Sequence, residues 1–276
     1  MVICKRKNII FKLLTVALLG LYLNCNAQIE NNLLPILVTR ITNVSSGNSI
    51  TFKYEGTKLI ETTDGELKSL YKYTGNVITQ IQDYKNDELI KTADFTYHKN
   101  GTLKRIKVDG IHQDYGHYTE DQTFTYPTPS TILCTESELY DNYEDKKPHK
   151  LSRLHTMNKG NMILKKDSSF EDESVELEVS KSYTYDKSNN PYLNIMGYHK
   201  IMPYILESYD EFMTGKNNMT SYRLFQRKQT ADPGLTANFE ITYNHSNFPE
   251  KVVSKYYNKD GVLYDKIIYT YNNYNR

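Results

Sequence analysis

The chain lacks several features that would narrow its class. It contains no tryptophan and only three cysteines, and two of these, Cys4 and Cys25, lie close to the N-terminus. Cys134 alone remains further along, so no disulfide framework holds the fold. Acidic and basic residues nearly balance, 33 against 34, which gives no basic face for nucleic acid. The longest apolar run, Leu13–Leu23, is shorter than the roughly 20 residues of a membrane-spanning helix.

Catalytic and cofactor signatures are also absent. The sequence has no Gly-x-Ser-x-Gly, no His-Glu-x-x-His, no Gly-x-Gly-x-x-Gly and no phosphate-binding loop. We therefore predict no catalytic residue, no cofactor and a non-enzymatic protein. A hydrolase without a recognisable motif stays as an alternative, because paired carboxylates far apart in sequence are recognised only by geometry.

The N-terminus has the pattern of an export signal. Four basic residues between Lys5 and Lys12 precede the apolar run Leu13–Leu23, which suits a signal peptide over residues 1–27. Cleavage after Ala27 would leave Gln28 first, and lipidation at Cys25 is the alternative. Either outcome predicts an exported protein of the periplasm or cell surface, and the second adds attachment to the outer membrane through lipid at Cys25.

Tyrosine is the abundant residue, with 25 Tyr and 9 Phe. Aromatic-x-Tyr pairs recur along the chain, mostly in a strand that is followed by a turn and a returning strand. Phe95–Val108 is the clearest copy. It has Phe95 and Tyr97 on one face of the first strand, an Asn100-Gly101 turn and a returning apolar strand. Asn-Gly is a strong hairpin signal because both residues tolerate positive φ. The other copies end at Tyr54, Tyr73, Tyr126, Tyr185, Tyr271 and, as the variant Ile-Thr-Tyr, at Tyr243.

The spacing of these copies predicts the fold class. The later units repeat at roughly 28 to 30 residues, and two double gaps indicate degenerate copies at His155–Asn161 and Phe212–Asn218. Two strands per unit give a mainly all-β protein with a large antiparallel meander of about 14 to 18 strands, which can close into a barrel. Residues 204–213 carry helical spacing and predict one short inserted helix.

The chain after the signal reads as one domain. We expect a leader or first strand at 28–48 and a single β-repeat domain at 49–276. The charged stretch Glu136–Lys150 is interpreted as a longer loop.

Two polar clusters and one cysteine are candidate sites. His112, Asp114 and His117 are potential metal ligands, but turn glycines surround them and favour simple solvation. Glu171-Asp172-Glu173 with Glu176 lacks a glycine-fixed calcium loop, so a solvated acidic loop is expected. Cys134 follows Ile132-Leu133 and is expected to be a buried structural thiol. We predict no metal.

The segment Tyr183–Tyr192, with an Asn-Asn-Pro-aromatic turn, precedes the apolar stretch Ile195–Leu206. In these features the chain resembles an uncharacterised family of bacterial envelope proteins, a domain of unknown function described as having a porin-like fold. The units are also similar to Tyr-Asp repeats of large secreted shell proteins, although only Tyr185-Asp186 carries that pair. The resemblance implies a large meander and contributes no catalytic residue.

Together these features favour a non-enzymatic exported envelope protein that binds or scaffolds a glycan or polypeptide. Tyrosine suits such contacts, because its apolar ring carries a hydroxyl at the rim. The alternative is an integral outer-membrane β-barrel, which the strand number allows.

Overall fold

The protein is described by a computed structural model over residues 35–142, 148–171, 174–202, 215–226, 236–258 and 261–272. Leu37–Tyr274 forms one compact unit that contains every described strand. In the second unit, Met1–Ile36 with Asn275–Arg276, only Pro35 and Ile36 are described. The predicted signal peptide and Cys25 therefore lie outside the described residues.

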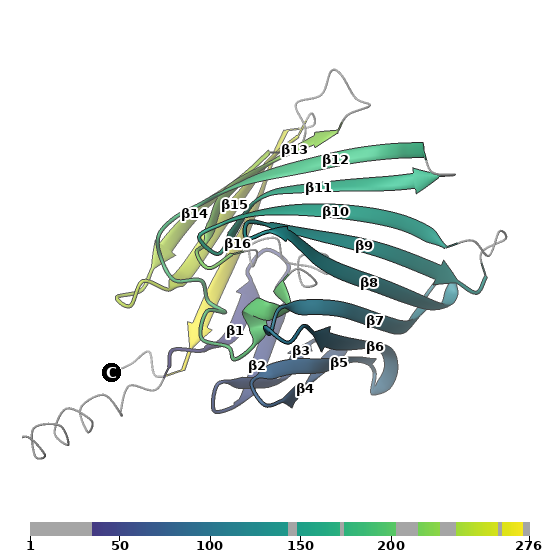
Figure 1. The fold of residues 1–276 in the computed structure, drawn as a ribbon. Helices are drawn as coiled ribbons and strands as arrows, with labels where there is room; N and C mark the ends of the chain where they lie inside the picture. The colour runs from purple at the N-terminus through teal and green to yellow at the C-terminus, as the bar shows by residue number, and fades with distance from the viewer. Residues whose placement is uncertain are drawn as a thin grey trace, which may run out of the picture. The chain divides into compact units, whose positions relative to one another are not determined.

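Sixteen antiparallel strands form a closed barrel (Figure 1). Their bounds in chain order are β1 Val38–Asn43, β2 Ser49–Glu55, β3 Lys58–Asp64, β4 Leu67–Thr74, β5 Val77–Lys85, β6 Glu88–Tyr97, β7 Leu103–His112, β8 Gly116–Thr128, β9 Thr131–Tyr140, β10 His149–Asn158, β11 Asn161–Glu171, β12 Ser174–Tyr185, β13 Met219–Gln226, β14 Thr236–Tyr243, β15 Pro249–Asn258 and β16 Gly261–Tyr271.

The strand order confirms the predicted meander and its closure. Each strand pairs with its neighbours in sequence, and β1 returns to β16 with Ile41 opposite Tyr269. Closure leaves no edge strand free to pair with another chain. The strand number lies within the predicted range of about 14 to 18.

The two faces of the wall differ in burial, as period-2 alternation requires. On β6 and β7, Phe95, Ile106 and Val108 point inward and are buried. Thr96 and Lys107 lie on the opposite face and are exposed. The apolar core therefore lies inside the barrel.

The aromatic-x-Tyr repeat has a structural basis at one end of the barrel. The ladder has a β-bulge beside the second tyrosine of units such as Lys53/Tyr54, Thr96/Tyr97 and Thr184/Tyr185. The degenerate copy has one at Thr156/Met157. A bulge adds one residue to a strand and re-aims the side chain beside it.

The hydroxyls of these tyrosines tie neighbouring units together. Tyr97 donates to the Ile78 carbonyl at 2.5 Å, and Tyr126 donates to the Leu103 carbonyl at 2.9 Å. Similar bonds are made by Tyr54, Tyr185 and Tyr271, whereas Tyr73 accepts from the Leu59 N–H and Tyr243 donates to Asp186. We call these seven residues the tyrosine collar: Tyr54, Tyr73, Tyr97, Tyr126, Tyr185, Tyr243 and Tyr271.

The connection from β12 to β13 interrupts the meander at the collar end. Its described part includes a 3-10 turn, η1 Tyr198–Lys200, which is drawn in green between the purple and the blue strands (Figure 1). The Met196 N–H donates to the Thr57 carbonyl at 2.9 Å, in the β2–β3 turn. We call residues 186–202 the crossing segment. The predicted helix at 204–213 lies outside the described residues, as do residues 212–214 of the degenerate copy Phe212–Asn218.

One sequence interpretation was wrong. The stretch Glu136–Lys150 is not one loop, because β9 continues to Tyr140 and β10 begins at His149. Its charged residues fit a strand because the buried Glu136 is paired with Arg153 inside the barrel. No helix in the described part of the chain has the length and apolarity to span a membrane.

Candidate functional site

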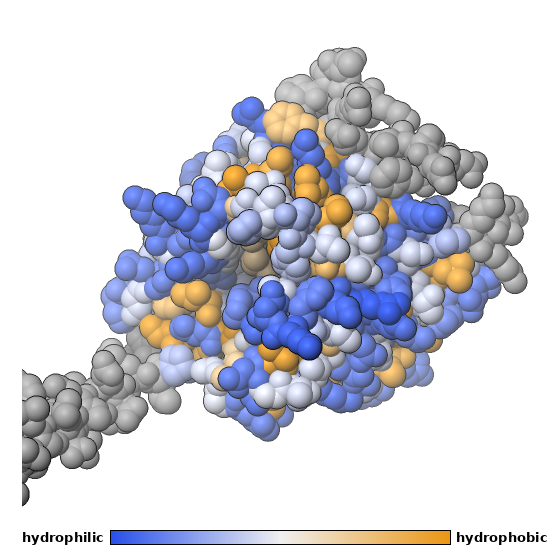
Figure 2. Space-filling model, viewed as in Figure 1, coloured by the Kyte–Doolittle hydropathy of each residue, from blue (hydrophilic) through white to orange (hydrophobic). Residues whose placement is uncertain are grey.

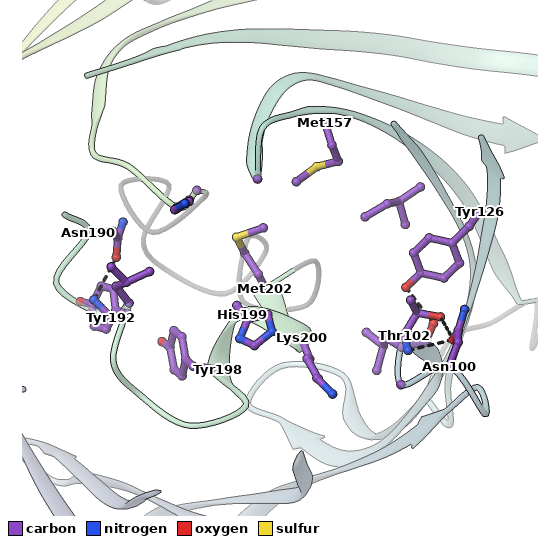
Figure 3. A pocket seen from close by; sticks show the side chains of 17 residues that line it. Asn100, Thr102, Tyr126, Met157, Asn190, Tyr192, Tyr198, His199, Lys200 and Met202 are labelled. Atoms are coloured by element: carbon purple, nitrogen blue, oxygen red, sulfur yellow. Dashed lines mark hydrogen bonds between the residues drawn. The ribbon is translucent and has the colours of Figure 1, made fainter. Parts of the chain in front are cut away.

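A cavity of about 700 Å³ opens at the collar end of the barrel. We call it the collar cavity. The β6–β7 turn, the ends of β8, β9 and β10, and the crossing segment provide its walls. Figure 3 shows Tyr126 and Met157 across this space from Tyr192 and Tyr198. A volume of this size suits a drug-sized ligand or a few residues of a peptide.

The walls are mainly apolar. Leu103 and Ile132 face the space from the barrel wall, and Met157 and Met202 approach it from opposite sides. Tyr192 and Tyr198 stack with ring centroids 5.3 Å apart, and Tyr192 also lies 6.2 Å from Phe52. Stacked rings and polarisable methionines adapt to apolar groups of varied shape.

Two lysines and one histidine are among the residues that line this space. Lys200 and Lys216 line the cavity together with His199. Burial and the nearby charge of Lys200 lower the pKa of His199, so its imidazole is neutral near neutral pH. The cavity therefore has mainly apolar walls, with two lysines among its lining residues.

Buried asparagines hold the crossing segment in place. The Asn218 side chain donates to the Asn189 carbonyl at 3.1 Å, and Asn217 donates to the Ser188 carbonyl at 2.9 Å. Asn161 on β11 exchanges two bonds with Asn217, at 2.9 and 3.0 Å. Asparagine suits this role, because its side chain offers donors and acceptors to backbone groups that have no ladder partner.

Comparison with known proteins identifies the fold. No family model matches the chain, and neither does any curated protein. A porin-like protein from Bacteroides vulgatus is similar over 86% of this chain and 99% of its own, with a TM-score of 0.58 and 15% identity. This chain has a porin-like fold. A porin-like protein from Bacteroides uniformis matches 82% of this chain and 77% of its own at 13% identity, with a TM-score of 0.34.

Inside the porin-like barrel, charged side chains form a network on β8 to β11. Arg153 pairs with Glu136, which also accepts a bond from Gln122 at 3.0 Å. Lys165 pairs with Asp167 at 3.3 Å. The Glu136 and Arg153 side chains retain only 5% and 12% exposure, so loss of one partner would leave the other charged and poorly hydrated.

His155 lies beside this network and is 1% exposed. Neither ring nitrogen has a hydrogen-bond partner among the residues that the structure describes. Burial, together with the nearby positive charges of Lys165 and Arg153, lowers the pKa of His155 to about 3. The native barrel thus holds this imidazole neutral.

We expect His155 to make the barrel sensitive to acid. The unfolded chain takes up a proton near pH 6.5, whereas the native chain does so only near pH 3. Between these values His155 should remove about 1.4 kcal/mol of stability per pH unit as the pH falls. In urea denaturation, the unfolding free energy of wild type should fall more steeply on acidification than that of His155→Leu. The variant should therefore gain stability relative to wild type as the pH falls. A parallel pH dependence of the two proteins would contradict this assignment.

The clusters weighed in the sequence do not assemble into a site. Ile111 is opposite His117 in the β7–β8 register, so His117 and His112 lie on opposite faces. His112 stacks on Tyr115, and His117 contacts Asp109 and Asp141 at the surface. Asp114 lies in the intervening turn, where its N–H donates to His112. The described part of the chain contains no group of metal-ligating side chains.

Two further predictions have different outcomes. Cys134 is a buried thiol in the wall, as expected. The side chains of Glu171, Asp172, Glu173 and Glu176 lie outside the described residues, so the acidic loop stays a prediction.

The sequence patterns did not predict the collar cavity. Its residues come from several turns and strand ends and form no motif. The asparagine pairs Asn189-Asn190 and Asn217-Asn218 were the available signal, because they flank the segment that interrupts the repeat.

Proposed function

We propose that this chain is a non-enzymatic, exported porin-like barrel of the cell envelope that binds a ligand in the collar cavity. The observation that carries the proposal is the crossing segment, which is fastened by asparagines and leaves about 700 Å³ of mostly apolar space beside it. Because these hydrogen bonds hold the crossing segment at one side of the space, the segment forms a wall of the collar cavity and leaves the cavity open. The ligand we expect is a glycan or polypeptide, and an equilibrium binding screen with both classes tests this expectation.

The porin-like fold supports the second candidate, an integral outer-membrane barrel, better than it supports an open scaffold. The polarity of the outer wall determines whether such a barrel faces lipid or water. Outer-membrane barrels present an apolar band to lipid and a polar interior. Here Lys72, Gln80 and Asp94 form a chain of hydrogen bonds across the outer face of β4 to β6.

The polar character extends beyond these strands. Arg105 pairs with Asp121 across β7 and β8, and Lys255 pairs with Glu240 across β14 and β15. Hydrophilic residues cover much of the face seen in Figure 2, with apolar residues scattered between them. In our proposal this wall faces water, and lipid at Cys25 provides any membrane attachment.

Fractionation distinguishes the two candidates. We expect the wild-type protein in the envelope fraction and the Cys25→Ser variant largely in the supernatant after an alkaline carbonate wash. Without the acyl anchor, the hydrogen-bonded and ion-paired side chains on the outer face of β4 to β8, β14 and β15 favour water over lipid. Retention of Cys25→Ser in the washed membrane pellet would overturn the water-facing barrel and favour the integral one. A resident outer-membrane barrel serves as the control for the wash.

A further inference from the structure

The outer face of β15, β16 and β1 is rich in basic side chains. These three strands are neighbours in the closed wall (Figure 1). Val252, Tyr269 and Ile41 are buried inside the barrel, so the residues that alternate with them point outward. On β16 and β1 the outward positions are Tyr264, Lys266, Ile268, Thr270, Arg40 and Thr42, and none of them is acidic.

The strand register places three cations around Ile268. Lys251 on β15 is directly opposite Ile268, and Lys266 lies two residues from Ile268 on the same face. Lys251 and Lys266 are therefore diagonal neighbours, roughly 7 to 8 Å apart. On the other side of β16, Arg40 is opposite Thr270. The three cations thus border one continuous stretch of the wall.

These cations are not neutralised within the protein. Lys251, Lys266 and Arg40 form no ion pair with a described side chain. On the adjoining β14, Glu240 is already paired with Lys255. Glu250 precedes Lys251 at a bulge of the β14–β15 ladder, and the two form no ion pair. The stretch therefore carries a local excess of positive charge.

Other parts of the wall differ in this respect. Lys107 on β7, for example, has Asp94 on one side and Asp121 on the other. The overall balance of charge in the sequence does not show the basic stretch, because Arg40, Lys251 and Lys266 come from the two ends of the chain and meet only when β1 closes on β16. Unopposed cations on neighbouring strands favour a polyanion that lies across them.

The side chains beside the cations suit a sugar polymer. Tyr264 is 63% exposed and lies two residues from Lys266 on the same face, so its ring can pack against the apolar side of a sugar. Thr270 is exposed beside Arg40 and offers a hydroxyl. Single-stranded nucleic acid is held mainly by stacking on successive aromatic rings. Lipid tails provide no hydrogen-bond partner for a threonine hydroxyl.

We infer that the outer face of β15, β16 and β1 binds an acidic polysaccharide. Its carboxylates contact Lys251, Lys266 and Arg40, and a sugar ring packs against Tyr264. This site lies on the outside of the wall and shares no residue with the collar cavity, so it goes beyond the proposed function.

Isothermal titration calorimetry with oligogalacturonate at low salt tests this inference, and the fully methyl-esterified oligomer provides a neutral ligand with the same backbone. We expect wild type to bind the acidic form, to lose affinity as salt is raised, and not to bind the ester. Lys251→Gln/Lys266→Gln should bind the acidic form about tenfold more weakly, as loss of two exposed charge contacts implies. Lys251→Arg/Lys266→Arg, which keeps both charges, should bind it like wild type.

Lys104→Gln/Lys107→Gln is the matched control, because it removes the same charge from exposed positions of β7. Thermal unfolding of each variant verifies the fold. Equal losses in the two Gln variants would overturn the site, because overall charge would then explain the binding. Absence of binding, or equal binding of the acid and the ester, would overturn it as well. Tighter binding of oligo-dT or of phosphatidylglycerol vesicles would overturn the polysaccharide as the ligand. None of these results affects binding in the collar cavity, which the screen proposed above tests separately.

Discussion

Replacing Tyr97 by alanine is expected to lower the free energy of unfolding by roughly 3 kcal/mol or more. The ring lies on the inward face of β6, and its hydroxyl donates to the Ile78 carbonyl at 2.5 Å. The substitution removes both the packed ring and a bond that links two hairpin units. Tyr97→Phe should cost about 1 kcal/mol, because it removes the hydroxyl alone. Equilibrium denaturation in urea measures both values.

The neighbouring Thr96 provides the matched control. It is exposed on the outer face of the same strand, and its hydroxyl donates to the Arg105 carbonyl at 3.3 Å. Thr96→Ala should therefore cost well under half as much as Tyr97→Ala. Equal losses from the two alanine variants would show that the facing of β6, and with it the role of the tyrosine collar, is wrong.

The repeat made most of the fold predictable. Alternating apolar residues, the Asn100-Gly101 turn and the spacing of the aromatic-x-Tyr pairs predict hairpins from local physics, and counting the repeats brackets the strand number. The bulge beside Tyr97 could not be read from the sequence, because alternation continues through it with only a one-residue shift. Closure of the sheet depends on β1 meeting β16 across the whole chain, so local patterns only allow it.

Charged residues inside the barrel are the reason why the loop predicted at Glu136–Lys150 was wrong. Glu136 and nearby charges favour a loop when only solvation is considered. In the structure Arg153 and Gln122 satisfy Glu136 in the interior, so the strand continues through it. Long-range pairing of this kind has no local sequence signal. The same limit applies to the collar cavity, whose lining residues come from turns and strand ends far apart in the chain.

Gly197→Ala is expected to displace the crossing segment. Gly197 has φ of +74°, and a Cβ there would lie 2.8 Å from the Asn76 carbonyl oxygen and 3.2 Å from the Val77 Cα. These are backbone atoms at the end of the β4–β5 turn and the start of β5, so they cannot rotate away. The left-handed conformation and the clash together should cost roughly 2 to 4 kcal/mol, measured by urea denaturation.

Gly75 separates the two contributions to that loss. It lies in the same β4–β5 turn with φ of +59°, but a Cβ there would have no atom within 4 Å. Gly75→Ala should therefore cost only about 1 kcal/mol, the left-handed penalty alone. Equal losses of stability from the two variants would show that the close contact of Gly197 with Asn76 and Val77 does not hold the crossing segment in place.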